Sequence, residues 1–366
     1  MEKFKKCGGV IAFIIAVLLI GLLRYSPEPS LPEALTVTED IKTMFVGRMA
    51  LDIPVSWSMS YSRVKFHLGE ESPRASITVS DQAGGSGNSD EWLDRQFQLI
   101  GLTKDFLSEG SEDLGQEDLS EDFGRPAGML IYKVTPMQFP SFFGEEPSKR
   151  PDLLNITMVL KESWGSFSFK YEEDLQAWPP AEGIDEYLQV KKAFLVDWVK
   201  DFLPRYEWTG NNEAGGGDYL STASGLINIS RPWPGLRYEL SANFSPAKDR
   251  ISFSDPTLSF TVSSFEARPP IFSRTANKSV GGHPGHESKR IFSLSKKGLD
   301  KLRFWEKKRN SLNLKWSDNA SAKATIDDPT YNFQLRTWDN DGDDSERIAY
   351  YLGVWNLALK SLRRIE

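Results

Sequence analysis

Short runs in which apolar and polar residues alternate recur along the whole chain. Alternation with a period of two, in segments rich in β-branched and aromatic residues, is typical of strands with one buried face. We therefore expect a chain rich in β-sheet. In the first half the pattern predicts strands over 44–54, 57–66, 75–80, 127–134, 154–160 and 165–171. In the second half it predicts strands over 225–230, 235–244, 258–264, 290–295, 302–307, 312–317 and 331–338.

Three segments instead have the apolar spacing of an amphipathic helix. Asn88 and Glu91 stand at the distance of a capping box, and an apolar stripe over 92–100 follows them. A second helix is expected over 184–203 and a third over about 344–363. Runs of strands with a few packed helices predict an α+β fold with largely antiparallel sheets.

The segment TGNNEAGGGD at 209–218 reads as a linker, because glycine and asparagine favour turn and coil. It divides the chain into an N-terminal domain over 41–208 and a C-terminal domain over 219–366. Each is expected to be a largely antiparallel sheet with one or two packed helices. A proline-rich tether over 25–40 precedes them.

The N-terminal segment 1–24 has the pattern of a membrane anchor. The run CGGVIAFIIAVLLIGLL at 7–23 carries no charge and follows Lys3, Lys5 and Lys6. This length lies near the lower limit for a bilayer-spanning helix, and the lysines hold the N-terminus on the cytoplasmic side. The pattern favours an uncleaved, single-pass signal anchor over a cleaved signal peptide, because RYSPEPSLPEALT offers no good cleavage site.

Composition excludes some functions. The formal net charge of −7 argues against a nucleic-acid partner, because phosphate binding needs a basic face. The one cysteine, Cys7, lies at the start of the apolar run, so the exported part has neither a disulfide nor a cysteine-ligated metal.

Candidate catalytic and metal-binding groups are few. The histidines are His67, His283 and His286, and no serine or cysteine is matched with one by its context. His283, His286 and Glu287 in GGHPGHE are potential ligands, but the proline and glycine predict a turn rather than a zinc-binding helix. The acidic run DNDGDDSE at 339–346 departs from a calcium loop in spacing and reads as a helix start. The sequence therefore predicts no catalytic residue, no cofactor and no metal ligand.

The acidic run at 109–122 and the high tryptophan content can each be explained by structure or by function. The seven acids of EGSEDLGQEDLSED at 109–122 predict a solvated loop, with a surface for a basic partner as the alternative. The 11 tryptophans fall mostly on apolar stripes or within strands, which favours core positions over carbohydrate stacking.

The order of several short motifs resembles the type VI secretion lipase-immunity family, the cognate inhibitors of secreted phospholipase effectors. No motif is specific alone, but their order covers most of the chain after the tether. The chain departs from the family pattern at Tyr219 and in lacking a nearby cysteine, which leaves open which toxin is recognised. The motifs are FVGRMALDIP at 45–54, GDYLSTASGLI at 217–227 followed by Glu239, VGGHPGHE at 280–287, FWE at 304–306, PTYNFQL at 329–335 and WNLALKSLRR at 355–364.

The resemblance implies an immunity protein that is not an enzyme. Such a protein is anchored in the bacterial inner membrane with most of its chain in the periplasm. It binds a phospholipase effector and blocks the active site or lid sterically. Its partners are that effector and, through the N-terminal helix, the inner membrane.

Two alternatives stay open, and each predicts a different surface. A periplasmic hydrolase of lipid or glycan predicts a cleft with a histidine or two close carboxylates. A membrane-tethered carbohydrate- or envelope-binding module predicts a row of exposed tryptophans on a sheet face. An immunity protein predicts a concave patch, acidic or apolar, that another protein can fill. The sequence nominates no partner-binding residue, and Gly47, Gly281 and Gly285 are expected to serve turns or close packing.

Overall fold

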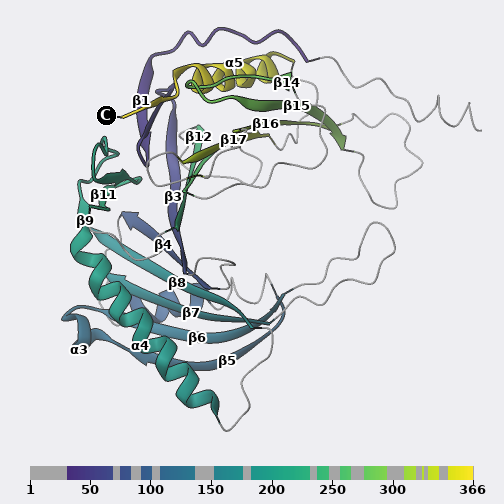
Figure 1. Cartoon of the computed structure of the whole chain (residues 1–366). Coiled ribbons are helices and arrows are strands. Elements are labelled where there is room, and N and C mark those ends of the chain that lie inside the picture. Colours follow the sequence, from purple (N-terminus) through teal and green to yellow (C-terminus); the bar gives the residue numbers. More distant parts are fainter. Residues whose placement is uncertain are drawn as a thin grey trace, which may run out of the picture.

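The fold is dominated by one 12-stranded antiparallel sheet, shown in Figure 1. The computed structural model describes residues 31–68, 75–83, 92–100, 108–136, 152–175, 183–230, 237–246, 256–264, 276–294, 309–318, 324, 329–337 and 345–365. In spatial order the large sheet contains β14 (Ala276–Asn277), β15 (Gly285–Leu294), β16 (Arg309–Asp318), β17 (Thr330–Arg336), β13 (Thr257–Ser263), β12 (Arg237–Pro246), β3 (Trp57–Leu68), β4 (Ala75–Ala83), β8 (Gly165–Leu175), β7 (Asp152–Lys161), β6 (Ala127–Pro136) and β5 (Ser108–Asp118).

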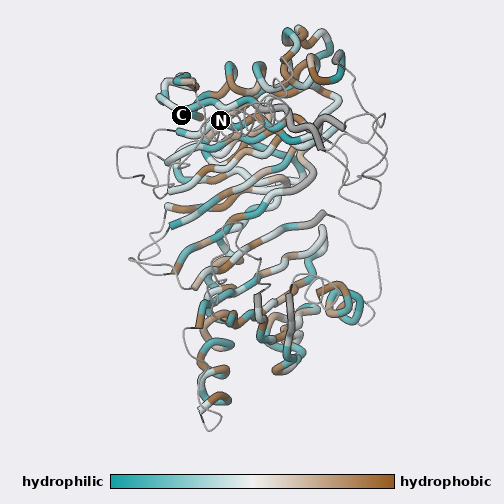
Figure 2. The backbone as a smooth tube through the Cα atoms, turned by 90° about the vertical axis from the view of Figure 1, so that its right-hand side faces the viewer, coloured by the Kyte–Doolittle hydropathy of each residue, from teal (hydrophilic) through white to brown (hydrophobic). Residues whose placement is uncertain are grey.

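The sheet runs without interruption across the two halves of the chain. β3 precedes the 209–218 segment and β12 follows it, yet the two strands pair over Trp57–His67 and Arg237–Pro246, with a bulge near Asn243. Polar and apolar residues alternate along both strands. Figure 2 shows stretches of both hydrophilic and hydrophobic colour along the strands of the large sheet. The two predicted domains therefore share one sheet, and their division stays a prediction.

Two long helices lie on the same, outer side of the bent sheet (Figure 1). The first, α4 (Ile184–Phe202), packs Trp198 and Phe202 against Phe66 of β3 at ring-centroid distances of 5.2 and 6.2 Å. Two further rings of β8, Phe167 and Phe169, lie 5.9 and 5.5 Å from Phe202. This aromatic cluster makes the core of the β3–β8 half.

The second long helix, α5 (Ser345–Ser361), covers the other half of the sheet. Its Trp355 ring lies 6.4 Å from Phe333 of β17, and its Tyr351 ring lies 6.4 Å from Trp57 of β3. A hairpin of β1 (Ile41–Val46) and β2 (Met49–Pro54) packs beside it, with β18 (Arg363–Arg364) paired to β2. These elements bury the apolar positions of β12, β13, β16 and β17.

A small three-stranded sheet lies between α4 and the β1–β2 hairpin (Figure 1). It consists of β9 (Tyr206–Trp208), β11 (Gly225–Asn228) and β10 (Tyr219–Ser221), and η2 (Leu203–Arg205) precedes it. Asp81 Oδ2 on β4 accepts hydrogen bonds from the hydroxyls of Tyr206, Thr222 and Ser224, at 2.7, 3.2 and 2.7 Å. One carboxylate thus fastens the small sheet to the large one.

The predicted linker over 209–218 has no helix or strand, but it is tied to the hairpin. Asn212 receives a hydrogen bond from the Phe45 backbone N–H at 2.6 Å and donates to the Phe45 carbonyl at 2.7 Å. The Gly215 N–H donates to Ser221 Oγ at 2.6 Å. This segment therefore has coil geometry with specific contacts to β1 and β10.

Most predicted elements are present, and the α+β, largely antiparallel class is confirmed. Residues 92–100 are helical, and α4 and α5 match the other two predicted helices within a few residues. The strand predicted over 44–54 is two strands, because Gly47 adopts a left-handed φ of 62° and turns the chain between β1 and β2. The strand predicted over 302–307 lies outside the described residues.

The acidic run 109–122 is not a loop, and this prediction is wrong. It forms most of the edge strand β5 and the short helix α3 (Ser120–Phe123). Its Glu117 forms an ion pair with Lys192 of α4. Charged side chains on an edge strand oppose pairing with another sheet, which gives the acids a structural role.

The N-terminal anchor and the 339–346 run remain predictions. The anchor over 1–24 lies outside the described residues, and so does most of 339–346. Among the described residues, no helix is both long enough and apolar enough to span a bilayer.

Candidate protein-binding surface

The inner face of the bent sheet, opposite α4 and α5, is polar from β16 to β8, whereas over β7 the 92–100 helix covers it by packing Trp92 and Leu93 on Val159. Because successive strand residues point to opposite faces, the residues that alternate with the buried core positions meet in rows across the strands. One such row contains Ser317 of β16, Asn332 of β17, Thr261 of β13, Ser241 of β12, Arg63 of β3, Ser80 of β4 and Ser168 of β8. The face therefore joins the two halves of the chain in one polar surface.

A second row, next to the first, carries charge. It contains Glu239 of β12, Lys65 of β3, Thr78 of β4, Lys170 of β8 and Thr157 of β7. The Lys170 ammonium lies 2.9 Å from the Glu172 carboxylate on its own strand. This row thus carries charge from β12 to β8, and two further exposed cations of the same face, Lys315 and Arg336, lie on β16 and β17.

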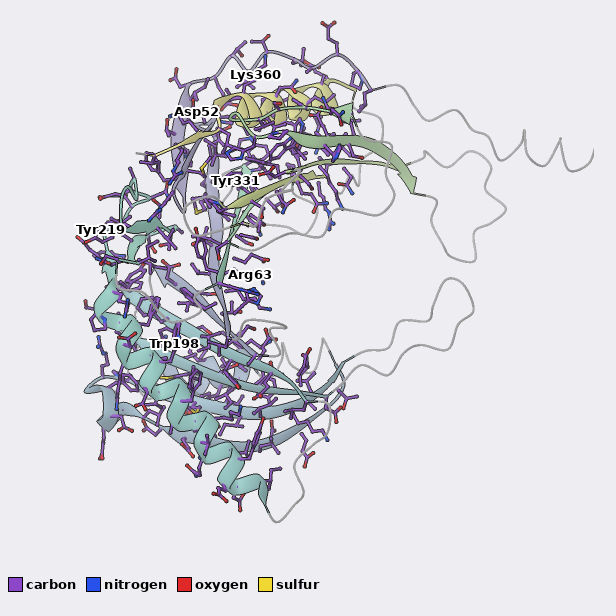
Figure 3. The ribbon with its side chains drawn as sticks, viewed as in Figure 1. Asp52, Arg63, Trp198, Tyr219, Tyr331 and Lys360 are labelled. Atoms are coloured by element: carbon purple, nitrogen blue, oxygen red, sulfur yellow. The ribbon has the colours of Figure 1, made fainter. Side chains whose placement is uncertain are left out.

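Basic residues predominate on the central strands of this face. Among the described side chains of β12, β3 and β4 that point inward, three are cationic and only Glu239 is anionic. We call these three cations, Arg63, Lys65 and Arg237, the cationic band. Figure 3 shows Arg63 extending from β3 on the side opposite Trp198 and α4. A protein with a net charge of −7 therefore presents a basic centre on its inner face.

His67 lies at one end of the band, opposite Arg237 in the strand register. Burial, the largest cause, and the positive charges of Lys65 and Arg237 together lower the pKa of His67 to about 4. The imidazole is neutral at pH 7, so it adds no charge to the band. Its depressed pKa reflects burial first and the positive charges of Lys65 and Arg237 second.

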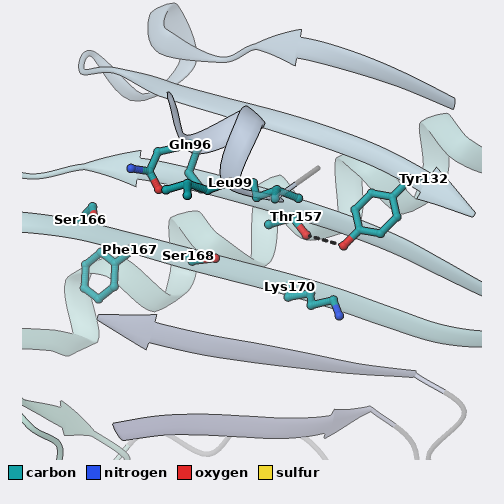
Figure 4. Close-up of a pocket in the computed structure, with 10 residues that line it drawn as sticks. Gln96, Leu99, Tyr132, Thr157, Ser166, Phe167, Ser168 and Lys170 are labelled. Carbon is teal, nitrogen blue, oxygen red and sulfur yellow. Dashed lines mark hydrogen bonds between the residues drawn. The ribbon is translucent and has the colours of Figure 1, made fainter. Parts of the chain in front are cut away.

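A cleft of about 260 Å³ adjoins this face, between the 92–100 helix and strands β6 to β8. Figure 4 shows Gln96 and Leu99 of the helix above the hydroxyl-bearing strands, where Tyr132 and Thr157 hydroxyls lie 3.4 Å apart. The described lining also includes Ser166, Ser168 and Lys170, and it holds no histidine and no carboxylate. The hydrolase alternative predicts such groups in a cleft.

The potential ligands of GGHPGHE, His283, His286 and Glu287, do not converge on one point. A turn holds the first, and the other two lie in β15. His283 closes a turn with Val280, and its Nδ1 lies 3.4 Å from Asp318 Oδ2. His286 and Glu287 follow in β15 and point to opposite faces. Glu287 faces α5, where it binds Lys278 at 2.8 Å and Trp355 at 2.7 Å. In the described part of the chain, no group of three or more histidine, cysteine or carboxylate side chains is placed to hold a metal ion.

The glycines singled out from the sequence have the expected structural roles. Gly47 and Gly281 adopt left-handed φ angles of 62° and 57°. A Cβ on Gly285 would lie 2.5 Å from the Trp316 ring and 2.6 Å from the Ser317 carbonyl oxygen. The turn and close-packing prediction is therefore confirmed at all three positions.

The tryptophans that the structure describes are mostly core residues. Trp57, Trp316 and Trp355 are fully buried, and Trp92 is 8% exposed. Trp208 is 44% exposed, but one ring face stacks on Trp164 at a centroid distance of 5.6 Å. These residues form no exposed row on a sheet face, which confirms the prediction of core use for the buried ones.

The cationic band was not identified from the sequence. Arg63 and Lys65 alternate with Val64 and Phe66, and this signal places both cations on one face of a strand. Only the pairing of β3 with β12 brings Arg237 beside them. The surface also differs in character from the expected acidic or apolar patch, because it is polar and its centre is basic.

Comparisons with known proteins give low similarity. No family model matches the chain, and no curated protein matches it. The apo structure of the immunity protein TplEi of the type VI secretion system of Pseudomonas aeruginosa is similar with a TM-score of 0.46 and 13% identity, over 88% of this chain and 97% of that one. A protein of unknown function from Pseudomonas aeruginosa, PA94, described as a putative regulator, gives a TM-score of 0.25 and 17% identity, over 42% of this chain and 93% of that one. Function therefore has to be argued from the residues of the chain itself.

Proposed function

We propose that this chain is an immunity protein that binds and inhibits a phospholipase effector of a type VI secretion system. The ordered motifs, from FVGRMALDIP to WNLALKSLRR, carry the resemblance to that class. The observation that carries the binding role is the polar inner face, which both halves of the chain build together. A surface of this breadth suits a protein partner better than a small ligand.

The motif residues support a binding scaffold. Glu287 of VGGHPGHE and Trp355 of WNLALKSLRR contact each other in the core, and Gly47 turns the hairpin of FVGRMALDIP. These residues hold α5 and the hairpin on the outer side of the sheet. We propose that the partner binds the inner face from β16 to β8, beside the 92–100 helix that covers β7.

Inhibition is proposed to be steric. A rigid sheet that seats the effector covers its active site or holds its lid, and a lipase must open its lid at the lipid surface. The proposed anchor over 1–24 keeps the inhibitor in the inner membrane with its body in the periplasm. Confinement to that membrane raises the effective concentration of inhibitor where the effector attacks.

Binding and inhibition are tested with the full-length chain in detergent. It is mixed with the product of the adjacent reading frame, co-purified, and assayed for phospholipase activity at increasing molar ratio. We expect a stable complex with activity abolished near one equivalent. Full activity of a lipase at molar excess of the chain would overturn the proposal.

A growth assay tests whether the chain acts in the periplasm. The effector is exported to the periplasm of a host cell that expresses either the full chain or a variant without residues 1–24. Protection by the full chain alone supports action in the periplasm. Equal protection by both versions would contradict it.

A further inference from the structure

We infer that the cationic band of Arg63, Lys65 and Arg237 binds an acidic segment on the effector. This inference rests on the proposed function, because it names the chemistry of the partner at the same inner face. The band lies on the adjacent strands β3 and β12, at the centre of the sheet. Its only described inward-facing carboxylate neighbour on β12, β3 and β4 is Glu239.

Only part of the charge of the three cations is balanced by a described residue, because Glu239 lies opposite Lys65 in the strand register and no second carboxylate faces inward on β12, β3 and β4. Arg63 is exposed, and neither it nor Lys65 nor Arg237 forms an ion pair with a described residue. Elsewhere the basic side chains are commonly paired, as Lys191 is with Glu173 and Lys278 is with Glu287. A cluster of like charges costs free energy unless an anion binds, so the band is poised for a negatively charged partner.

The spacing of the band fits carboxylates on an extended segment. Arg63 and Lys65 are two residues apart on one face of a strand, which separates them by about 7 Å. Acidic residues that alternate along an extended segment of the effector have the same repeat. Guanidinium groups bind carboxylates with two parallel hydrogen bonds, and the hydroxyls of Ser241 and Thr78 beside the band offer further polar contacts.

The negative charge of the rest of the chain directs an acidic partner to the cationic band. With a net charge of −7 and an acidic edge strand, most of the protein repels an acidic partner. Electrostatic complementarity mainly sets orientation and association rate. The band therefore steers an acidic segment toward the middle of the inner face.

The test compares charge reversal on the two sides of the sheet. The first variant is Arg63→Glu with Arg237→Glu. The matched control is Lys360→Glu with Arg364→Glu, which makes the same change in net charge on the outer side, where Figure 3 places Lys360. A neutral variant, Arg63→Gln with Lys65→Gln and Arg237→Gln, covers the case in which charge reversal disturbs folding. Circular dichroism and thermal melting verify the fold of each full-length variant.

Binding to the effector is measured for each protein at low and at high salt. We expect the inner-face variants to bind about 10- to 100-fold more weakly, with a smaller salt dependence, and the control to bind like the wild type. An equal loss in the control, or unchanged binding of folded inner-face variants, would overturn the inference while inhibition by the wild type stands. A wild type that neither binds nor inhibits the effector would overturn the proposed function, and this inference with it.

Discussion

The indole N–H of Trp355 donates a hydrogen bond of 2.7 Å to Glu287 Oε1, which joins α5 to β15 across 68 residues of sequence. Trp355 is fully buried and Glu287 is 9% exposed. The same carboxylate binds Lys278 at 2.8 Å and lies 3.5 Å from Lys289. The motifs VGGHPGHE and WNLALKSLRR are thus partners in the core.

Trp355→Phe keeps the aromatic ring and removes the donor. Hydrogen bonds to charged groups contribute about 1.5–3 kcal/mol, so we expect a loss of that order in the free energy of unfolding. Trp57→Phe is the matched control, because its Nε1 donates to the neutral Tyr350 hydroxyl at 3.3 Å and Trp57 is equally buried. Urea unfolding measures both, and a larger loss for Trp57→Phe would contradict this account.

Acid is expected to weaken the same contact. Burial raises the pKa of Glu287, but hydrogen bonds from Lys278 and Trp355 and the charges of Lys278 and Lys289 outweigh it, so the pKa lies below its ordinary value of 4.5. A carboxyl with a depressed pKa stabilises the fold above its unfolded pKa, and this stability is lost as the pH falls through the folded pKa. Glu287→Gln should reduce the slope of unfolding free energy against pH below about 4.5. An unchanged slope would rule out this contribution.

His67 is expected to titrate far below an ordinary histidine. Its pKa of about 4 lies below the usual 6.5, so the unfolded chain binds more protons between these values. Stability should therefore fall as the pH drops from about 6.5 to about 4. NMR titration of the imidazole measures the pKa directly. Arg237→Gln should raise this pKa, and an unchanged value would show that Arg237 does not act on His67.

Gly285→Ala is expected to destabilise the sheet. The new Cβ would meet the Trp316 ring at 2.5 Å and the Ser317 carbonyl oxygen at 2.6 Å, so the two strands have to move apart. Overpacking of this kind costs about 1–3 kcal/mol. Gly183→Ala is the control, because no heavy atom lies within 4 Å of its added Cβ. Similar melting temperatures for the two variants would contradict the close-packing role.

Asp81→Ala should loosen the small sheet from the large one. Removal of the carboxylate leaves the hydroxyls of Tyr206 and Ser224 without this acceptor, whereas the Thr222 hydroxyl keeps the Gly225 carbonyl at 2.9 Å. Unsatisfied buried groups cost about 1–3 kcal/mol each, so a loss of at least that order is expected. Asp197→Ala on the exposed side of α4 is the control, with a change within about 0.5 kcal/mol. Hydrogen exchange of β9 to β11 should increase in Asp81→Ala alone.

Most strands and all three predicted helices follow from local pattern. Alternation along 57–66 or 165–171 predicts both the strand and its buried face, because the period of two is a property of the backbone. The same reasoning failed at 109–122, where acids outnumber apolar residues. That segment is a strand because β6 offers it an open row of backbone hydrogen-bonding groups, and an edge strand needs little apolar surface of its own.

The sequence alone determined most of the strands, where the helices lie and which glycines the turns require. Only the tertiary structure decided which strands are neighbours, since pairing depends on backbone groups far apart in the chain. The contact of β3 with β12 is the decisive case, because it makes one sheet out of two halves and places Arg237 beside Arg63 and Lys65. The local pattern shows on which face of its strand each cation lies. The three cations form a band only because β3 and β12 are adjacent in the sheet.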